Sequence, residues 1–182
     1  EYEKWTRPAF DLDLINTLLS PSIRYISDKF TLQLGSQFIF QNNKNNIDDR
    51  LVPDATSFNL GPYVLIEYEK DNLGINSGVR YDYKRLISDD QFLDLDYENS
   101  FNSTSFSSGL YYRFIDHILR LTFSGAYRSP HVSELFSDGV HHGTNRYEIG
   151  DEKLDIEYAN QVDFKYQFSS DHLGIVINPF IQ

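Results

Sequence analysis

The sequence predicts an all-β protein, an antiparallel up-and-down meander of about eight strands of the kind that builds a transmembrane β-barrel. Three observations support this fold class. Apolar and polar residues alternate over long runs, aromatic residues are abundant, and short turns and long polar stretches separate the runs in strict order. A strand points successive side chains to opposite faces, and a membrane barrel needs an apolar outer face and a polar inner one.

The run from Phe30 to Phe40 shows the alternation most clearly. Its even positions read Phe, Leu, Leu, Ser, Phe, Phe, whereas its odd positions read Thr, Gln, Gly, Gln, Ile. Runs of this kind extend over roughly 10–15 residues, beyond the mean of about 5–6 for strands in globular proteins. This length suits a strand that crosses a bilayer at a tilt.

The same reasoning, taken in order along the chain, predicts strands near 10–26, 30–41, 57–69, 73–85, 101–114, 118–128, 155–168 and 172–181. The first strand is the least regular, because Pro21 interrupts it and its alternation slips after Leu14. Short polar turns near 28, 71, 116 and 170 join antiparallel neighbours. The long polar stretches 41–56, 86–100 and 129–154 are predicted to be loops.

Composition narrows the class of protein. The 182 residues suffice for one domain, and 13 Tyr with 14 Phe match the aromatic girdles of a membrane barrel. The chain contains no run of about 18 apolar residues, so no membrane-spanning helix is predicted. The net charge of −11 argues against a nucleic-acid partner, and the absence of Cys excludes disulfides and thiol chemistry. Because Met is also absent and no signal peptide opens the chain, we expect an internal or processed piece of a longer protein.

Two short boxes follow one another in the third long polar stretch and the strand after it. The first has the form Arg-x-Pro-x-x-x-Glu-Leu and consists of Arg128, Pro130, Glu134 and Leu135. The second has the form Gly/Asn-x-x-Leu-x-x-Glu, here with Gly150, Leu154 and Glu157. Upstream, the segment 60–83 contains a hairpin ending in Gly-Val-Arg-Tyr-Asp-Tyr.

In these features the chain resembles the barrel of TonB-dependent receptors from the outer membrane of Gram-negative bacteria. The resemblance implies a barrel of some twenty-two strands with a plug domain inside it and an N-terminal segment that engages TonB. We expect residues 1–182 to form part of such a barrel, without the plug and the TonB box. It further implies contact with outer-membrane lipid and, through the plug, with the TonB complex.

Elementary chemistry assigns mainly architectural roles to the boxes. Gly150 lies in a turn-rich stretch where a positive φ is useful. Arg128 has the carboxylates of Glu134 and Glu157 as candidate partners, or a ligand carboxylate. Pro130 removes a backbone donor and ends the strand. We favour the reading in which these residues shape the entrance of a long loop.

Three histidines lie in the stretch between the boxes and are the candidate ligand-binding residues, together with Glu134: His131, His141 and His142. Imidazole and carboxylate groups suit zinc or haem iron. The resemblance favours this reading, because haem and zinc receptors of the family carry a His in this region. A solvated loop with incidental histidines is the alternative, and the identity of any metal stays open.

Catalysis has little support, because no nucleophile elbow or phosphate-binding Gly-rich loop occurs and carboxylate pairs such as Asp89-Asp90 lie in predicted loop. We therefore expect no enzyme and no intrinsic cofactor, but a section of a receptor that takes up a ferric siderophore, haem or zinc. The transported cargo would then be a metal chelate or another small ligand. Two alternatives stay open: a self-contained eight-stranded outer-membrane barrel with a structural or adhesion role, and a soluble β-sheet binding module.

Overall fold

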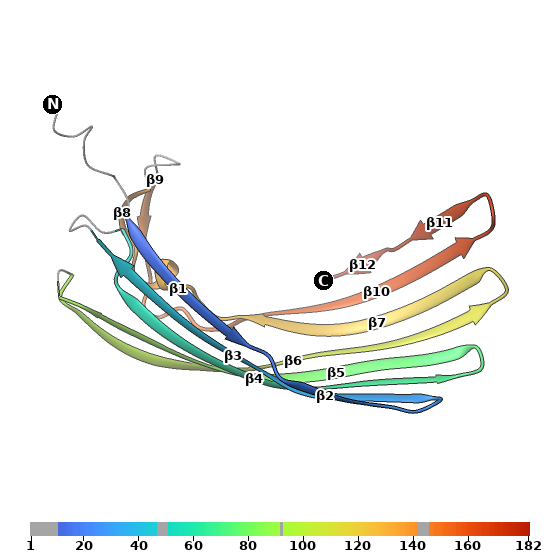
Figure 1. Cartoon of the computed structure of the whole chain (residues 1–182). Helices are drawn as coiled ribbons and strands as arrows, with labels where there is room; N and C mark the ends of the chain where they lie inside the picture. The colour runs from blue at the N-terminus through green and yellow to red at the C-terminus, as the bar shows by residue number, and fades with distance from the viewer. Residues whose placement is uncertain (1–10, 47–50, 92, 142–145) are drawn as a thin grey trace.

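In a computed structural model, which describes residues 11–46, 51–91, 93–141 and 146–182, the chain forms one curved antiparallel sheet (Figure 1). Its strands are β1 (Leu12–Leu19), β2 (Ser22–Ile26), β3 (Phe30–Asn45), β4 (Ala55–Lys70), β5 (Leu73–Asp90), β6 (Leu95–Phe114), β7 (His117–Arg128), β10 (Glu157–Ser169), β11 (Gly174–Ile177) and β12 (Phe180–Ile181). Between β7 and β10 lie α1 (Val132–Phe136), β8 (Asp138–His141) and β9 (Arg146–Ile149). The predicted antiparallel meander is confirmed.

Neighbours in the sheet follow the order β1-β3-β4-β5-β6-β7-β10-β11, with β2 also paired to β3 and β12 also paired to β10. β1 and β2 thus act as one interrupted strand, as do β11 and β12, which gives the eight strands predicted. Within the described residues β1 and β11 form the two edges, so the sheet is an open section of a wall. It differs in this from a closed eight-stranded barrel.

Pro21 interrupts the first strand without shifting its pairing. Leu19 lies opposite Phe38 and Ser22 lies opposite Gly35, so both pieces keep one register against β3. The Pro21 carbonyl still accepts a hydrogen bond from the Ser36 N–H at 3.1 Å. The slip expected after Leu14 is therefore not one of pairing register.

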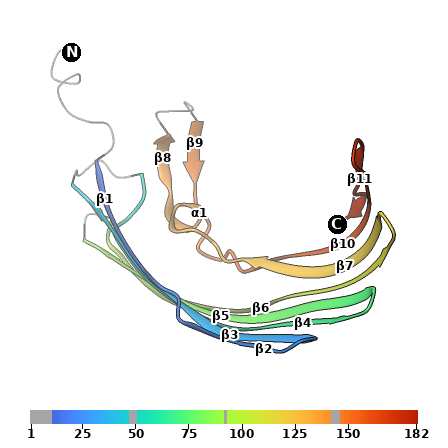
Figure 2. The ribbon, with the colours of Figure 1, turned by 45° about the vertical axis from the view of Figure 1, so that its right-hand side comes forward.

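The two faces of the sheet differ in chemistry. Pairing places on one face, the convex one, the apolar side chains of Leu32, Leu34, Val64, Ile66, Ile75, Val79, Leu110, Leu121, Val162 and Phe164. The concave face carries polar groups such as Arg80, which pairs with Asp82 at 2.6 Å and donates to Gln37 at 3.0 Å. α1 and the β8–β9 hairpin rise from this concave side (Figure 2).

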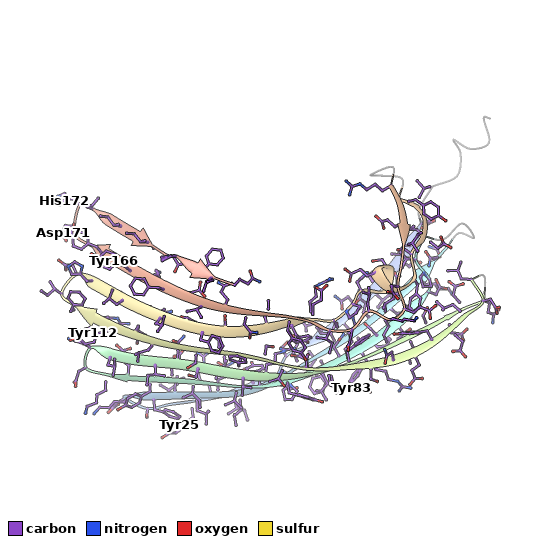
Figure 3. All side chains as sticks on the ribbon, turned by 180° about the vertical axis from the view of Figure 1, so that it is seen from behind. Tyr25, Tyr83, Tyr112, Tyr166, Asp171 and His172 are labelled. Atoms are coloured by element: carbon purple, nitrogen blue, oxygen red, sulfur yellow. The ribbon has the colours of Figure 1, made fainter. Side chains whose placement is uncertain are left out.

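Aromatic side chains gather on the convex face near the short turns. Figure 3 shows Tyr25, Tyr112 and Tyr166 toward this end of the strands and Tyr83 farther toward the loops. The His117 ring stacks on Phe114 at 4.8 Å and contacts Phe168 at 5.0 Å between ring centroids. Transmembrane β-barrels carry aromatic residues in girdles near the ends of their strands, and this cluster has the same position along the strands.

Two of the predicted loops are shorter than expected, because the strands continue into them. β3 extends to Asn45, β5 to Asp90, and β6 already begins at Leu95. The convex face turns polar at the start of these extensions, as the ion pair of Arg85, the last residue of the predicted strand, with Glu98 at 2.7 Å shows. The apolar register of the convex face, which marked the strands, ends here, although backbone pairing continues to Asp90 and Leu95.

Asp89 and Asp90 were also assigned wrongly, since both belong to β5. Asp90 is only 1% exposed and accepts a hydrogen bond from the Asp54 N–H at 3.0 Å. Ser88 donates to the Asp54 carbonyl at 2.7 Å. These bonds attach the connection between β3 and β4 to the end of β5. The carboxylate of Asp90 therefore has a structural role at the loop end of the sheet.

The third predicted loop, 129–154, contains regular structure. It holds the one-turn helix α1 and the antiparallel pair β8–β9, in which Asp138 lies opposite Ile149. No helix in the described part of the chain is long and apolar enough to cross a membrane.

Candidate functional site

The first box builds a capped helical turn directly after β7. Pro130 is buried and precedes His131, the N-cap of α1. The Ser133 N–H donates to His131 Nδ1 at 3.3 Å, and the Glu134 carboxylate accepts from the His131 N–H at 2.9 Å. This reciprocal capping box satisfies backbone donors at the start of the helix. The sequence forms α1 here because a side-chain acceptor and a Glu stand three residues apart.

Arg128 links the two boxes through ion pairs. Its Nη1 donates to both carboxylate oxygens of Glu134 at 2.7 Å, and its Nη2 lies 2.9 Å from Glu157 Oε2. A single guanidinium therefore holds the helix of the first box against the strand of the second. Both carboxylates proposed as partners from the sequence pair with Arg128.

Gly150 brings the second box onto the first through a close backbone approach. Its N–H donates to the Ser137 carbonyl at 2.6 Å. A Cβ at this position would lie 2.5 Å from the Leu135 carbonyl oxygen and the Phe136 nitrogen. No glycine in the described residues has a positive φ. The expected reason for Gly150 was therefore wrong: the residue must be small because two backbones touch.

An apolar cluster on the concave face supports this contact. Leu135 is 1% exposed and packs with Val132 and the wall residues Ala55, Leu86 and Phe101. Because a buried leucine contributes about 1.5–3 kcal/mol, this cluster fixes α1 to the wall more firmly than the exposed ion pairs do.

Leu154 contributes less to the packing of the apolar cluster than its place in the second box predicts. It is 40% exposed, while Ile156 packs against the cluster instead. The Leu154 N–H donates to the Asp151 carbonyl at 3.2 Å, which closes a turn before β10.

Charge and burial set the protonation of the cluster. The His131 N–H and the Arg128 guanidinium stabilise the charged Glu134 carboxylate and lower its pKa. Burial, with help from the nearby Lys84 ammonium, lowers the pKa of His131. At neutral pH the imidazole is therefore uncharged, as its role as hydrogen-bond acceptor at the N-cap requires.

The structure brings only some of the proposed ligand-binding residues together. His131 and Glu134 share the capping box, whereas His141 is the last residue of β8 and His142 lies outside the described residues. Among the described residues no group of three His, Cys, Asp or Glu side chains is placed to hold a metal ion. The use of these residues in binding stays a prediction.

Sequence reasoning missed Lys84, which joins the cluster from β5. Its Nζ donates to Ser129 Oγ at 3.1 Å and to the Pro130 carbonyl at 2.9 Å. The alternation did place Lys84 on the polar face, but nothing in it indicated contact with a box 45 residues away. Together, Lys84, Arg128, Glu134, Leu135 and Gly150 form a structural support, called the buttress below, which connects the strands with α1 and the segment that follows the β8–β9 hairpin. Their side chains are not arranged as in a catalytic site.

Comparison with known proteins assigns the fold to a family. The model of the family described as TonB dependent receptor-like, beta-barrel matches residues 4–180. The copper transporter OprC superposes with a TM-score of 0.78 at 16% identity, over 93% of this chain and 29% of OprC. The FrpB iron transporter from Neisseria meningitidis (F3-3 variant) gives 0.67 at 14% identity, over 88% of this chain and 26% of FrpB. This chain thus spans less than a third of either structure. It belongs to the β-barrel family of TonB-dependent receptors.

Proposed function

We propose that the chain is a section of the barrel wall of a receptor that imports a scarce nutrient across the outer membrane of a Gram-negative bacterium. The rest of that receptor would supply further strands, a plug and the segment through which TonB delivers energy. Transport, and no catalysis, is the activity of such a protein.

The observation that carries this proposal is the division of the sheet into two faces. The convex face exposes apolar side chains that suit lipid, while the concave face offers a polar wall with paired charges such as Arg80 and Asp82. A ligand moving along this wall would stay solvated or hydrogen-bonded. The capped box cluster of Arg128, Glu134 and Gly150 supports the loops at one end of that path.

Metal uptake is the finer part of the proposal. The similar structures are a copper transporter and an iron transporter. We therefore propose a cargo that is either a metal ion such as zinc or a metal chelate such as a ferric siderophore or haem. Contact with the cargo would involve the loop of His131, His141 and His142. Because His131 and Glu134 already stabilise α1, we place the first contact at the β8–β9 hairpin, which carries His141.

The test uses bacteria that express the whole receptor. Cells with the receptor, without it, and without TonB are given haemin, a ferric hydroxamate chelate, zinc salt or copper salt, and accumulated metal is measured. We expect one of these cargoes to accumulate only when receptor and TonB are both present. Accumulation of all four that is independent of TonB would contradict the proposal. Changing His141 and His142 together to Ala, with His172→Ala at a short turn as the control, then tests the loop.

A further inference from the structure

A cavity of about 180 Å³ lies on the concave face beside the box cluster. Its walls come from β1, β3, β4 and β5 and from the start of α1. Leu12, Leu14 and Val132 give it an apolar side, and Asn43, Lys84 and His131 add polar groups. An apolar cavity of about 150 Å³ is enough to bind a benzene ring, so this volume suits a small organic molecule.

Lys84 brings a positive charge that no carboxylate in the described residues neutralises by an ion pair. Its ammonium is half-buried, and both of its acceptors, Ser129 Oγ and the Pro130 carbonyl, are neutral. Glu134 attracts it electrostatically, but that carboxylate is already bound by Arg128 and by the His131 N–H. An ammonium has three donors, so one remains for an incoming anion.

Asn43 adds a hydrogen-bond acceptor that has no donor, whereas Lys84 offers a donor. The Asn43 Oδ1 atom has no hydrogen-bond donor in the described structure and almost no accessible surface, so the amide of this lining residue must turn toward the cavity before a ligand can reach it. A buried acceptor without a donor costs free energy, and a ligand hydroxyl would remove that cost. The cavity therefore combines an apolar side, a cation and an unsatisfied acceptor.

We propose that this cavity binds a small hydroxycarboxylate with an apolar body, of the size of a hydroxybenzoate. The carboxylate pairs with Lys84, the hydroxyl donates to Asn43 Oδ1, and the ring or chain packs against Leu12, Leu14 and Val132. The site does not depend on the cargo or on TonB, so its failure would leave the proposed transport intact.

Binding is measured by isothermal titration calorimetry on the whole receptor, purified in detergent, with 3-hydroxybenzoate as the probe. The neutral analogue 3-hydroxybenzamide is expected to bind about tenfold or more weakly, because it lacks the charge that pairs with Lys84. Benzoate, which lacks the hydroxyl, is expected to bind about threefold to tenfold more weakly. Failure of the probe to bind, or equal binding of the acid and the amide, would overturn the proposal.

Variants locate the site. Lys84→Gln is expected to lose about tenfold in affinity for 3-hydroxybenzoate, whereas Lys84→Arg keeps most of it. Lys165→Gln, a concave-face lysine on β10 outside the cavity, is the matched control and should bind as the wild type does. Unchanged affinity in Lys84→Gln would overturn the assignment.

A second variant covers the case in which Lys84→Gln fails to fold. Leu14→Trp fills the cavity from β1, where Leu14 is 56% exposed among the described residues and a larger side chain can be accommodated. Folding is checked by the shift in gel mobility that β-barrels show on heating. We expect folded Leu14→Trp to lose binding, and binding at wild-type affinity would place the probe elsewhere.

Discussion

The two halves of the paired strands β5 and β6 are built from the same backbone ladder but meet different surroundings. Near the short turns, their convex face carries Ile75 opposite Leu110, which are 40% and 47% exposed. Near the loops, the same face carries the ion pair of Arg85 with Glu98. The concave face is polar near the short turns, whereas near the loops it carries Leu86 and Phe101, which pack under α1. The backbone ladder alone therefore does not determine where the apolar convex surface ends; in the proposed receptor, the edge of the lipid layer would determine it.

The largest effect is expected from a charge in the apolar half. Leu121→Arg places a cation between Leu110 and Phe164 on the convex face. An arginine near the middle of the bilayer costs about 2–4 kcal/mol in the free energy of unfolding. Denaturant unfolding of the whole receptor in lipid vesicles measures this cost.

Asp96→Arg is the matched control, because Asp96 has the same orientation in the loop-end half and lies opposite Asp89. There the new cation faces water and a carboxylate, so stability should be unchanged or slightly raised. Equal losses in the two variants would show that the boundary between the halves is misplaced.

The second-largest effect is expected from a substitution at the contact between the two boxes. Gly150→Ala would place a methyl group against the backbone of Leu135 and Phe136, and overpacking of this kind costs about 1–3 kcal/mol. We expect faster hydrogen exchange in α1 and in the β8–β9 hairpin. The sheet itself should be unaffected.

Gly174→Ala provides the control, since a Cβ at that glycine would meet nothing within 4 Å. If both substitutions left exchange unchanged, the close approach at Gly150 would not be needed for the buttress.

The turn-end and loop-end halves of the sheet also differ in how well the sequence predicted them. Alternation located the strands wherever the convex face is apolar and the concave face polar, as at Phe30 to Phe40. It failed at Asp89 and Asp90, because beyond Arg85 the convex face is largely polar and the apolar side chain of Leu86 lies on the concave face instead. The two residues pair there with Asp96 and Leu95 of β6, and a bond between residues 36 positions apart, from the Asp54 N–H to Asp90, fixes the end of the strand. No local pattern of apolar residues encodes that bond.

The candidate site was predictable to a similar extent. The charges of Arg128, Glu134 and Glu157 indicated ion pairs, with a ligand carboxylate as the alternative partner of Arg128. The reason for Gly150 could not be found, since only the fold shows that the Leu135 backbone lies against it. Lys84 escaped notice for the same reason.

The third-largest effect is the dependence of the stability of α1 on pH. Burial lowers the pKa of His131 in the folded protein, so the unfolded state takes up a proton first as pH falls below the ordinary value of 6.5. The stabilisation by neutral His131 is therefore complete above pH 6.5 and is lost as pH falls through the lowered pKa. Hydrogen exchange of α1, corrected for its intrinsic rate, should accelerate over this range.

His131→Asn keeps a side-chain acceptor at the N-cap but does not titrate. We expect the acceleration between pH 6.5 and lower pH to disappear in this variant, while exchange in β5 and β6 stays as in the wild type. An unaltered pH dependence would assign the effect to another group.

The smallest effect is expected at the ion pair that marks the loop-end half. Arg85 and Glu98 are 46% and 55% exposed in their side chains, so water and salt screen their attraction. Glu98→Gln should therefore change the free energy of unfolding by less than about 0.5 kcal/mol, and less still at high salt. The measurement is the denaturant unfolding used for Leu121→Arg. A loss of the size expected for Leu121→Arg would mean that this pair is held in a dry environment, and the apolar boundary would then lie beyond Arg85.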